Sequence, residues 1–267
     1  MNFSLWLRFA ARDLRSGLQG FWIFLTCLTL GTAAIAIIGS LSASIERGLN
    51  EQGQPLLGGD VEFSPVHREA TDKELDFIAS NGAVSKVATL RAMAIAPETA
   101  TLVEIKATDA FYPLYGQVLL ENAGTLQGAT AMKSGTYGVA ADPLLLGRLG
   151  VKPGDKIRVG SLDVEIGGVI ANEPDRISDG FILGPRLLMS ADALKATGLI
   201  QPGSLVTYRY RVKLDQDQSL QAARDLVTKA KEQFPDSGWQ LRSRDRAAQG
   251  AENFVDRLSY FLTLVGL

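Results

Sequence analysis

The residue types that could carry out catalysis are few in this 267-residue chain. His67 is the only histidine, and with Ser64 close by it is a candidate base for a Ser-His-Asp triad. It lies in a polar stretch just after a proline, however, and no G-x-S-x-G motif is present to expose a catalytic serine on a strand-to-helix turn. We therefore expect His67 to be an exposed loop residue.

Two acidic pairs are closely spaced: Asp60 with Glu62, and Asp175 with Asp179. Two-carboxylate catalysis needs further geometry that spacing alone does not supply, so solvation on a strand or in a loop explains both pairs. The one cysteine, Cys27, lies in an apolar run, and the other carboxylates are scattered singly, which argues against a metal site. The sequence thus predicts no catalytic, cofactor-binding or metal-binding residue, and no cofactor.

Nucleotide-binding motifs are also missing. The chain has no G-x-x-x-x-G-K-[ST] loop, so we expect that it does not hydrolyse ATP itself. The glycines of the segment GGDVEF are isolated, whereas a dinucleotide fingerprint needs a strand, G-x-G-x-x-G and a helix in that order. The sequence on its own therefore predicts a protein that is not an enzyme.

The strongest pattern in the sequence is an apolar run. Between residues 16 and 45 the only ionisable side chain is the thiol of Cys27. The stretch FWIFLTCLTLGTAAIAIIGSL is about as long as a helix that spans a ~30 Å hydrocarbon layer, so we predict a transmembrane helix at residues 21–45. The alternative is a signal peptide cleaved near Ser42 or Ser44, but the run exceeds the roughly 7 to 15 apolar residues of a signal core.

Basic residues indicate the orientation of this helix. Three arginines precede the run and one follows it closely: Arg8, Arg12, Arg15 and Arg47. Basic loops stay in the cytoplasm, so the N-terminus is expected there and the chain from residue 46 outside. Residues 1–20 separate apolar and basic side chains on two helical faces, which predicts an interfacial helix; a plain cytoplasmic extension of the membrane helix is the alternative.

The chain finishes on a second apolar run, LSYFLTLVGL, at residues 258–267. Ten residues are too few to span a bilayer. A helical pattern that starts at residue 244 leads into this run, interrupted only by Gly250. We interpret the run as the truncated start of a second transmembrane helix, preceded by a helical stalk, and expect the sequence to be an N-terminal fragment.

The exported part, from Glu46 to Arg257, holds 24 of the 27 basic and 28 of the 29 acidic residues, a formal charge of −4. A mildly acidic domain does not have the basic surface of a nucleic-acid-binding protein. Because Cys27 lies in the apolar run, this part cannot form an internal disulfide, which leaves its redox compartment open.

Local signals outline an α/β layer at the beginning of the exported part. GGDVEF predicts a strand, and Thr71 with Glu74 three residues later matches a capping box for a helix of about ten residues. Asn81 and Gly82 supply its end. Two β-rich runs follow, VSKVATLRAMAIA and TATLVEIKATD.

The layer resumes near the end of the exported part. LVTYRYRVKL alternates strictly, and we expect its basic face, Arg209, Arg211 and Lys213, to be solvated. SLQAARDLVTKAKEQF then predicts a helix that ends at Pro235, and GWQLRS predicts a last strand. Strand, helix and strand complete a split βαβ layer with the opening segment.

A separate β-rich unit is expected between the two halves of the layer. SGTYGVAADPLLLGRLGVKPGDKIRVGSLDVEIGGVIANEPD predicts a strand, a short leucine-rich helix and two strands that meet in a hairpin at Gly160-Ser161. A further short helix follows, with Ser190 as its expected cap. We interpret this unit as a small inserted β-barrel or sandwich.

The predicted fold class is α+β: a transmembrane helix, an exported domain made of a split βαβ layer with an inserted small β-barrel, and the start of a second transmembrane helix. The predicted boundaries are 1–20 for the N-terminal helix, 21–45 for the first transmembrane helix, 46–257 for the exported domain and 258–267 for the start of the second transmembrane helix. Within the domain they are 46–133 and 198–243 for the layer, 134–197 for the insertion and 244–257 for the stalk.

Two segments resemble a known family. ADPLLLGRLGVKPGDKIRVGSLDVEIGGVIANEPD resembles the periplasmic core domain of FtsX/MacB-type ABC transporter permeases, which lies between their first and second transmembrane helices. DRISDGFILGPRLLMSADALKATGLIQPGSLVTYRY is similar to the YbbP-like subgroup. The resemblance covers essentially the whole chain, from LRFAARDLRSG to ENFVDRLSYFLTLVGL.

The resemblance implies a permease subunit of the bacterial inner membrane, with residues 46–257 in the periplasm. It implies a homodimer or pseudo-dimer that contacts membrane lipid, is driven by a separate cytoplasmic ABC ATPase and meets a periplasmic partner protein. Such permeases transmit ATPase closure through helical stalks, here Leu41 to Leu57 and Arg244 to Arg257. Family members carry at least four spanning helices, so this chain departs from the pattern by stopping inside the second.

Three functional hypotheses remain open from the sequence. The first is the permease subunit, for which export of a lipid or another hydrophobic molecule is suggested by analogy alone. The second is a single-pass membrane-anchored periplasmic binding or scaffold protein. The third is a hydrolase secreted after cleavage near Ser44, which would depend on His67 or on one of the acidic pairs.

Overall fold

The computed structural model describes residues 21–33, 36, 40, 53–121, 124–176 and 184–244. The chain divides into two compact units, residues 1–49 with 249–267, and residues 50–248. In the first unit residues 21–33 are helical, as the sequence predicts. Across these described ranges we find no helix with both the length and the apolar character needed to cross a bilayer. The interfacial helix, the stalk after Arg244 and the run at 258–267 lie outside the described residues.

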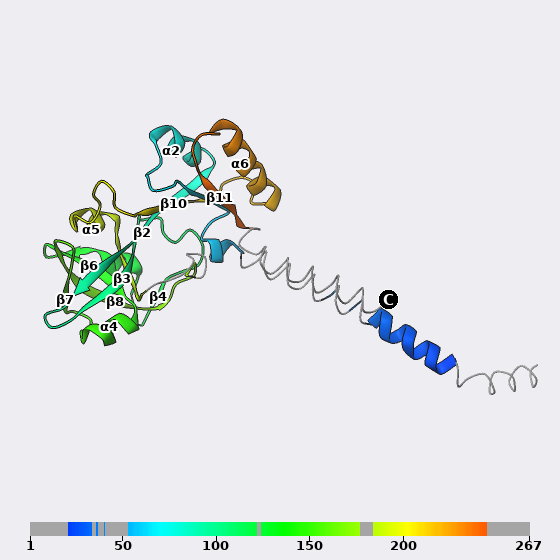
Figure 1. The fold of residues 1–267 in the computed structure, drawn as a ribbon, viewed down its shortest axis with the longest axis horizontal. Coiled ribbons are helices and arrows are strands. Elements are labelled where there is room, and N and C mark those ends of the chain that lie inside the picture. The colour runs from blue at the N-terminus through cyan, green and yellow to red at the C-terminus, as the bar shows by residue number, and fades with distance from the viewer. Residues whose placement is uncertain are drawn as a thin grey trace, which may run out of the picture. The chain divides into compact units, whose positions relative to one another are not determined.

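The second unit is built on one long mixed sheet (Figure 1). Its strands follow the order β11-β1-β10-β2-β3-β9-β6-β8-β4, with β5 beside β6, and β7 beside β2 and β8. The strands are β1 (Val61–Ser64), β2 (Gly82–Ile95), β3 (Ala100–Thr108), β4 (Leu119–Leu120), β5 (Met132–Lys133), β6 (Thr136–Ala141), β7 (Lys156–Val159), β8 (Leu162–Asn172), β9 (Arg186–Ser190), β10 (Thr207–Leu214) and β11 (Gln240–Ser243). The helices are α2 (Asp72–Ala79), α3 (Leu126–Thr130), α4 (Pro143–Leu149), α5 (Ala191–Ala196) and α6 (Leu220–Gln233).

The α/β layer forms from the local signals that predict it. Glu74 accepts a hydrogen bond from the backbone N–H of Thr71 at 2.7 Å, which satisfies a donor at the start of α2. Ser219 caps α6 through the N–H of Ala222. In Figure 1 both helices lie at the end of the domain formed by β10 and β11. The predicted helices and the last strand of this layer are therefore confirmed.

An aromatic cluster packs the two helices onto the sheet. Phe63 of β1 meets Trp239 at 5.3 Å between ring centroids, in an edge-to-face arrangement. Phe77 of α2 contacts Phe234 at the end of α6, with the centroids 5.3 Å apart. Phe63 is fully buried, so this cluster is the core of the layer.

The predicted hairpin of the inserted unit is also confirmed. β7 and β8 pair antiparallel around Gly160 and Ser161, and Gly160 takes a positive φ of 60° beside the carbonyl oxygen of Thr197, where a Cβ atom would come within 2.3 Å. Ser190 caps α5 by accepting the N–H of Ala193. The small β-barrel predicted for this unit is not confirmed by the strand order.

The long strands β2 and β3 belong to both halves of the domain. β2 pairs with β10 along residues 82–89 and with β7 at residues 94–95. β3 pairs with β2 on one side and runs parallel to β9 on the other. The division of the domain at residues 134 and 197 therefore stays a prediction, while strand pairing joins both parts into one sheet.

The expectation for β10 is wrong in one respect. Tyr208, Tyr210 and Val212 are buried as the alternation predicts, but the opposite face is not solvated throughout. Arg211 is 1% exposed, because its guanidinium is ion-paired inside the domain with Glu62 and Asp175. Other side chains of the domain thus cover part of the β10 face that the sequence predicts to be solvent-exposed.

Replacing Phe63 with alanine tests the core of the layer. We expect Phe63→Ala to lower the free energy of unfolding by about 3–5 kcal/mol, because it leaves a cavity under Trp239. The measurement is a urea titration of the full chain in detergent micelles, followed by circular dichroism. Phe111→Ala is the control, since Phe111 is 67% exposed and should change the midpoint little. Equal shifts for both variants would show that the cluster does not form.

Candidate functional site

Both ends of the domain are held by one buried carboxylate. Asp60 is completely buried. Its side chain accepts hydrogen bonds from Gln54 Nε2 at 2.8 Å, from the hydroxyl of Tyr115 at 2.8 Å, from Arg244 Nη1 at 2.8 Å and from the backbone N–H of Leu214 at 3.0 Å. Gln54 lies near the start of the described domain and Arg244 at its end, so Asp60 joins the two ends of the domain to strand β10.

Backbone hydrogen bonds reinforce this junction. The N–H of Arg244 donates to the carbonyl of Asp60 at 3.0 Å, and the N–H of Asp60 donates to the carbonyl of Val212 at 2.7 Å. Burial and the hydrogen bond to Asp60 raise the pKa of Tyr115 above its ordinary value, so its hydroxyl stays protonated and remains a donor. We call Gln54, Asp60, Tyr115, Leu214 and Arg244 the chain-end junction.

A network of buried ion pairs begins at Glu62, two residues after Asp60. Arg211 of β10 contacts Glu62 of β1 at 3.0 Å and is also paired with Asp175, which follows β8. Lys106 of β3 then bridges Asp175 at 2.7 Å and Glu173 at 2.6 Å, and all three side chains are fully buried. The pairs connect strands of the layer with the segment that leaves the inserted unit.

The network continues to β9. Arg186 contacts Glu173 at 3.2 Å and Glu104 at 3.1 Å. Tyr112 donates a hydrogen bond to Asp175 at 2.6 Å, and burial among these carboxylates raises its pKa well above the ordinary value. The Tyr112 ring also lies 4.7 Å from Lys106 Nζ, a cation–π contact. The ionised side chains of these pairs form one cluster, which we call the buried ion network: Glu62, Glu104, Lys106, Glu173, Asp175, Arg186 and Arg211.

Two glycines make room for the network. Gly58 has a positive φ of 74°, and a Cβ atom there would lie 3.0 Å from Arg211 Nη1. At Gly59 a Cβ atom would lie 3.1 Å from Arg211 Cβ. The isolated glycines of GGDVEF therefore serve packing: they let the chain pass close to a buried guanidinium.

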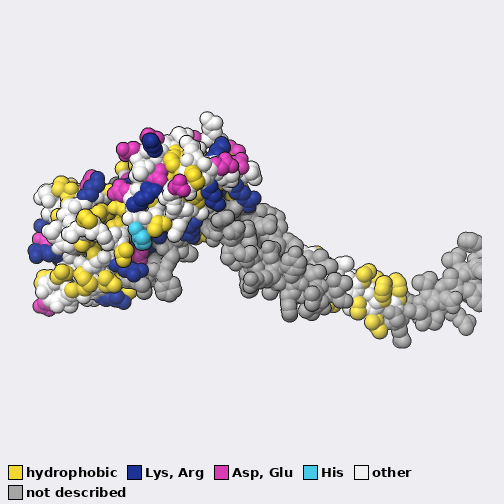
Figure 2. Space-filling view, turned by 45° about the horizontal axis from the view of Figure 1, so that its top comes forward, with side chains coloured by type: hydrophobic (Ala, Val, Ile, Leu, Met, Phe, Trp, Pro, Cys, Tyr) yellow, Lys and Arg dark blue, Asp and Glu magenta, His cyan; other side chains and the backbone are white. Residues whose placement is uncertain are grey.

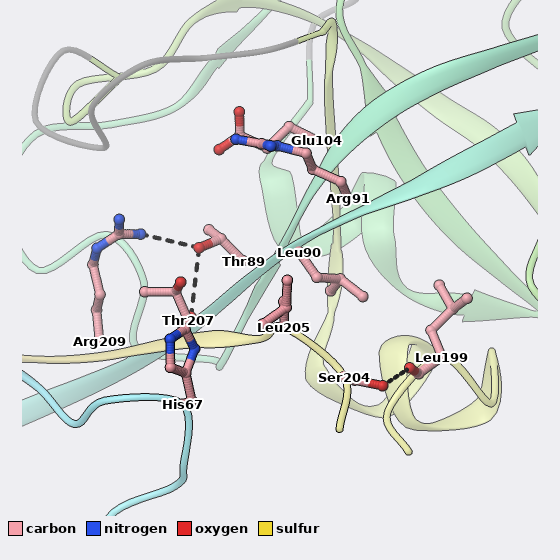
Figure 3. A pocket seen from close by; sticks show the side chains of 10 residues that line it. All are labelled: His67, Thr89, Leu90, Arg91, Glu104, Leu199, Ser204, Leu205, Thr207 and Arg209. Atoms are coloured by element: carbon pink, nitrogen blue, oxygen red, sulfur yellow. Dashed lines mark hydrogen bonds between the residues drawn. The ribbon is translucent and has the colours of Figure 1, made fainter. Parts of the chain in front are cut away.

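A pocket of about 560 Å³ opens at the Glu104 end of the network. It is drawn in Figure 3 and is lined by residues of β2, β3, β10 and two loops: His67, Thr89, Leu90, Arg91, Glu104, Leu199, Ser204, Leu205, Thr207 and Arg209. Arg209 donates to the hydroxyl of Thr89 at 3.1 Å, and Thr89 donates to the carbonyl of Thr207. Outside the pocket, Figure 2 shows acidic and basic side chains mixed over the visible face.

The residues singled out in the sequence fall into two groups. His67 is exposed as expected, and Ser64 donates its hydroxyl to the carbonyl of Tyr208, so the structure places Ser64 in the sheet. The expectation that the acidic pairs are solvated is wrong for Asp60, Glu62 and Asp175, which are at most 1% exposed because each is paired with an arginine or lysine. Asp179 lies outside the described residues.

Sequence analysis did not find the partners of these carboxylates. Glu104 and Lys106 lie two residues apart in β3, and Arg186 lies in β9. The signal available was the charge itself, because an ionisable residue within a buried strand needs a partner. Among the described residues no group of three or more His, Cys, Asp or Glu is arranged to hold a metal ion. The geometry is that of a structural junction and a pocket.

The chain is similar to proteins of one family. Residues 21–230 match the family model of the MacB-like periplasmic core domain. The uncharacterized ABC transporter permease YbbP of Escherichia coli (strain K12) is 31% identical over 241 residues, which are 90% of this chain and 28% of that protein. The chain thus spans well under a third of the length of this relative.

Two solved structures are also similar. The periplasmic region of MacB from Actinobacillus actinomycetemcomitans has a TM-score of 0.44 and 12% identity, over 75% of this chain and 96% of that one. The extracellular domain of the noncanonic ABC-type transporter YknZ from Gram-positive bacteria has a TM-score of 0.45 and 13% identity, over 68% of this chain and 99% of that one.

The buried ion network should be costly to break at one residue. We expect Lys106→Met to lower the free energy of unfolding by about 3–5 kcal/mol, because two buried carboxylates lose a cation. Lys86→Met is the matched control: Lys86 pairs with the half-exposed Glu69, and its loss should cost below about 1 kcal/mol. Thermal melting of both variants in detergent measures the difference. A Lys106 variant as stable as the Lys86 variant would contradict the network.

Proposed function

Because the chain belongs to the MacB-like periplasmic core domain family, we propose that it is part of the permease subunit of an ABC transporter. In this proposal a separate cytoplasmic ATPase supplies the energy, and helices at both ends of the domain transmit its movement to the periplasmic side. The permease is a homodimer or pseudo-dimer in the bacterial inner membrane. Its domain division, 46–133 and 198–243 around 134–197, is the one predicted from the sequence.

The observation that carries the proposal is the chain-end junction. Gln54 and Arg244 both bind the buried carboxylate of Asp60, so a displacement of either chain end acts on the same side chain. Asp60 is bonded in turn to Leu214 of β10, and β10 lies at the centre of the layer between β1 and β2. This arrangement suits the transmission of movement and needs no catalytic residue.

The apolar run supports a membrane location. In the helix at residues 21–33, the hydroxyls of Thr26, Thr29 and Thr32 donate to backbone carbonyls four residues earlier, at 2.7–2.9 Å. Polar groups satisfied within their own helix can enter the hydrocarbon layer. We propose that residues 21–45 span the membrane and that residues 258–267 begin a second span.

For the substrate we propose a lipid or another hydrophobic molecule that is exported, which rests on analogy with the family. A second candidate function is a single-pass membrane-anchored binding protein. It is favoured by the pocket at Glu104, because binding of a ligand in this pocket would need no ATPase.

Cysteine labelling tests the proposed topology. In a Cys27→Ala background, we expect Glu98→Cys, in the exposed loop between β2 and β3, to react with a membrane-impermeant maleimide added to intact spheroplasts. Ser4→Cys, in the segment expected in the cytoplasm, should react only after the membrane is disrupted. Labelling of both sites, or of neither, in intact spheroplasts would contradict the orientation.

Purification and hydrogen exchange test the function itself. We expect the natively expressed protein, extracted in mild detergent, to co-purify with an ABC-type ATPase. In that complex, an ATP analogue should change amide exchange in β1 and β10, and Asp60→Asn should abolish the change by weakening the hold on Arg244. Asp163→Asn, on the exposed pair with Arg158, is the control. Isolation without an ATPase would favour the anchored binding protein.

A further inference from the structure

The floor of the pocket is a polar sheet face. Arg91 and Glu104 are direct partners in the register of β2 and β3, and Thr89 is the partner of Thr207 in the register of β2 and β10. Side chains of directly paired residues lie on the same face of the sheet. Figure 3 shows this polar floor with Arg209 beside it. The pocket is therefore lined by guanidinium groups, hydroxyls and one carboxylate.

Glu104 carries the decisive observation. It is only 8% exposed, and its Oε1 atom accepts from Arg186 Nη1 at 3.1 Å. Its Oε2 atom is buried and has no hydrogen-bond partner among the described residues. A buried carboxylate oxygen without a donor is destabilising, so such atoms are rare and call for an explanation. A ligand with an N–H group would supply the missing donor.

The charges around Glu104 indicate the other half of the ligand. Arg186 already balances the Glu104 carboxylate, and Arg209 is paired with Glu62 at 3.9 Å, whereas Arg91 brings a further guanidinium group to the pocket. Arg91 is exposed, and it lies directly across from Glu104 in the register. An anionic group close to the N–H donor of the ligand would therefore meet Arg91 while the donor meets Glu104.

The rim of the pocket is apolar on one side. Leu199 and Leu205 lie in the segment between α5 and β10, and Leu205 is 76% exposed. An exposed leucine at the mouth of a polar pocket provides a surface for an apolar substituent. The volume of about 560 Å³ falls within the roughly 300–1,000 Å³ that ligand pockets occupy.

We propose that this pocket binds a compact zwitterion, with its ammonium group on Glu104 Oε2, its carboxylate or phosphate on Arg91, and any apolar substituent along Leu199 and Leu205. Two sources share this chemistry: a free apolar α-amino acid, and the phosphoethanolamine headgroup of a lipid. The inference does not depend on the ATPase, so it holds equally for a permease and for an anchored binding protein.

Two ligand series test the proposal with the unaltered full chain in detergent, by isothermal titration calorimetry. The first compares L-leucine with N-acetylleucine, which has no ammonium group, and with leucinamide, which has no carboxylate. The second compares O-phosphoethanolamine with phosphocholine, which has no N–H donor. We expect leucine or phosphoethanolamine to bind, and the analogue without the ammonium N–H to bind at least tenfold more weakly.

Variants locate the binding. Glu104→Gln and Arg91→Ala should each weaken the zwitterion at least tenfold, while the exposed controls Glu98→Gln and Arg148→Ala should not. Glu104→Gln also removes a charged partner of Arg186. The two ligand series use the unaltered chain, so their result does not depend on this variant. Binding of leucine alone would identify an amino-acid site, and binding of phosphoethanolamine alone a headgroup site. No binding in either series, or equal binding of the analogues without an ammonium N–H, would overturn the proposal.

Discussion

The pairing of charges inside the sheet is the constraint on which the rest of this domain depends. The side chains of Lys106, Asp175 and Glu173 are fully buried, and removing such groups from water costs several kcal/mol per ion unless each one meets a partner. The partners come from segments far apart in the sequence. The network can therefore be complete only when β1, β3, β9, β10 and the segment after β8 are all in place, so that it favours one arrangement of the sheet.

This constraint explains why the two parts of the domain behave as one sheet. Hydrogen bonding along β2 and β3 joins them, but backbone pairing alone tolerates a shift in register. A shift of one residue would turn Lys106 away from Glu173 and Glu104 away from Arg186. The ion pairs thus select the register of the strands. The chain-end junction is bonded to β10, a strand of this sheet, so its position is fixed by the same register.

Local features of the fold could be predicted from the sequence, whereas the buried charges could not. The caps at Thr71 and Ser190, and the hairpin at Gly160, depend on residues a few positions apart, so they are visible in the chain itself. Alternation in β10 shows that Arg211 lies opposite Tyr210, but it does not show which side chains cover the arginine. That information is in Glu62 and Asp175, which are distant in sequence.

The same reasoning applies to the pocket. Arg91 and Glu104 become neighbours only through the register of β2 and β3, and the orphan oxygen of Glu104 becomes visible only when Arg186 is seen to occupy the other one. Because Arg186 is shared between Glu104 and Glu173, a donor at Glu104 Oε2 would alter how strongly that carboxylate holds Arg186. A ligand in the proposed site would therefore act on the buried ion network, which includes Arg211 of β10. The N–H of Leu214, on the same strand, donates to Asp60, so contiguous polar contacts and strand β10 connect the proposed site with the two ends of the domain.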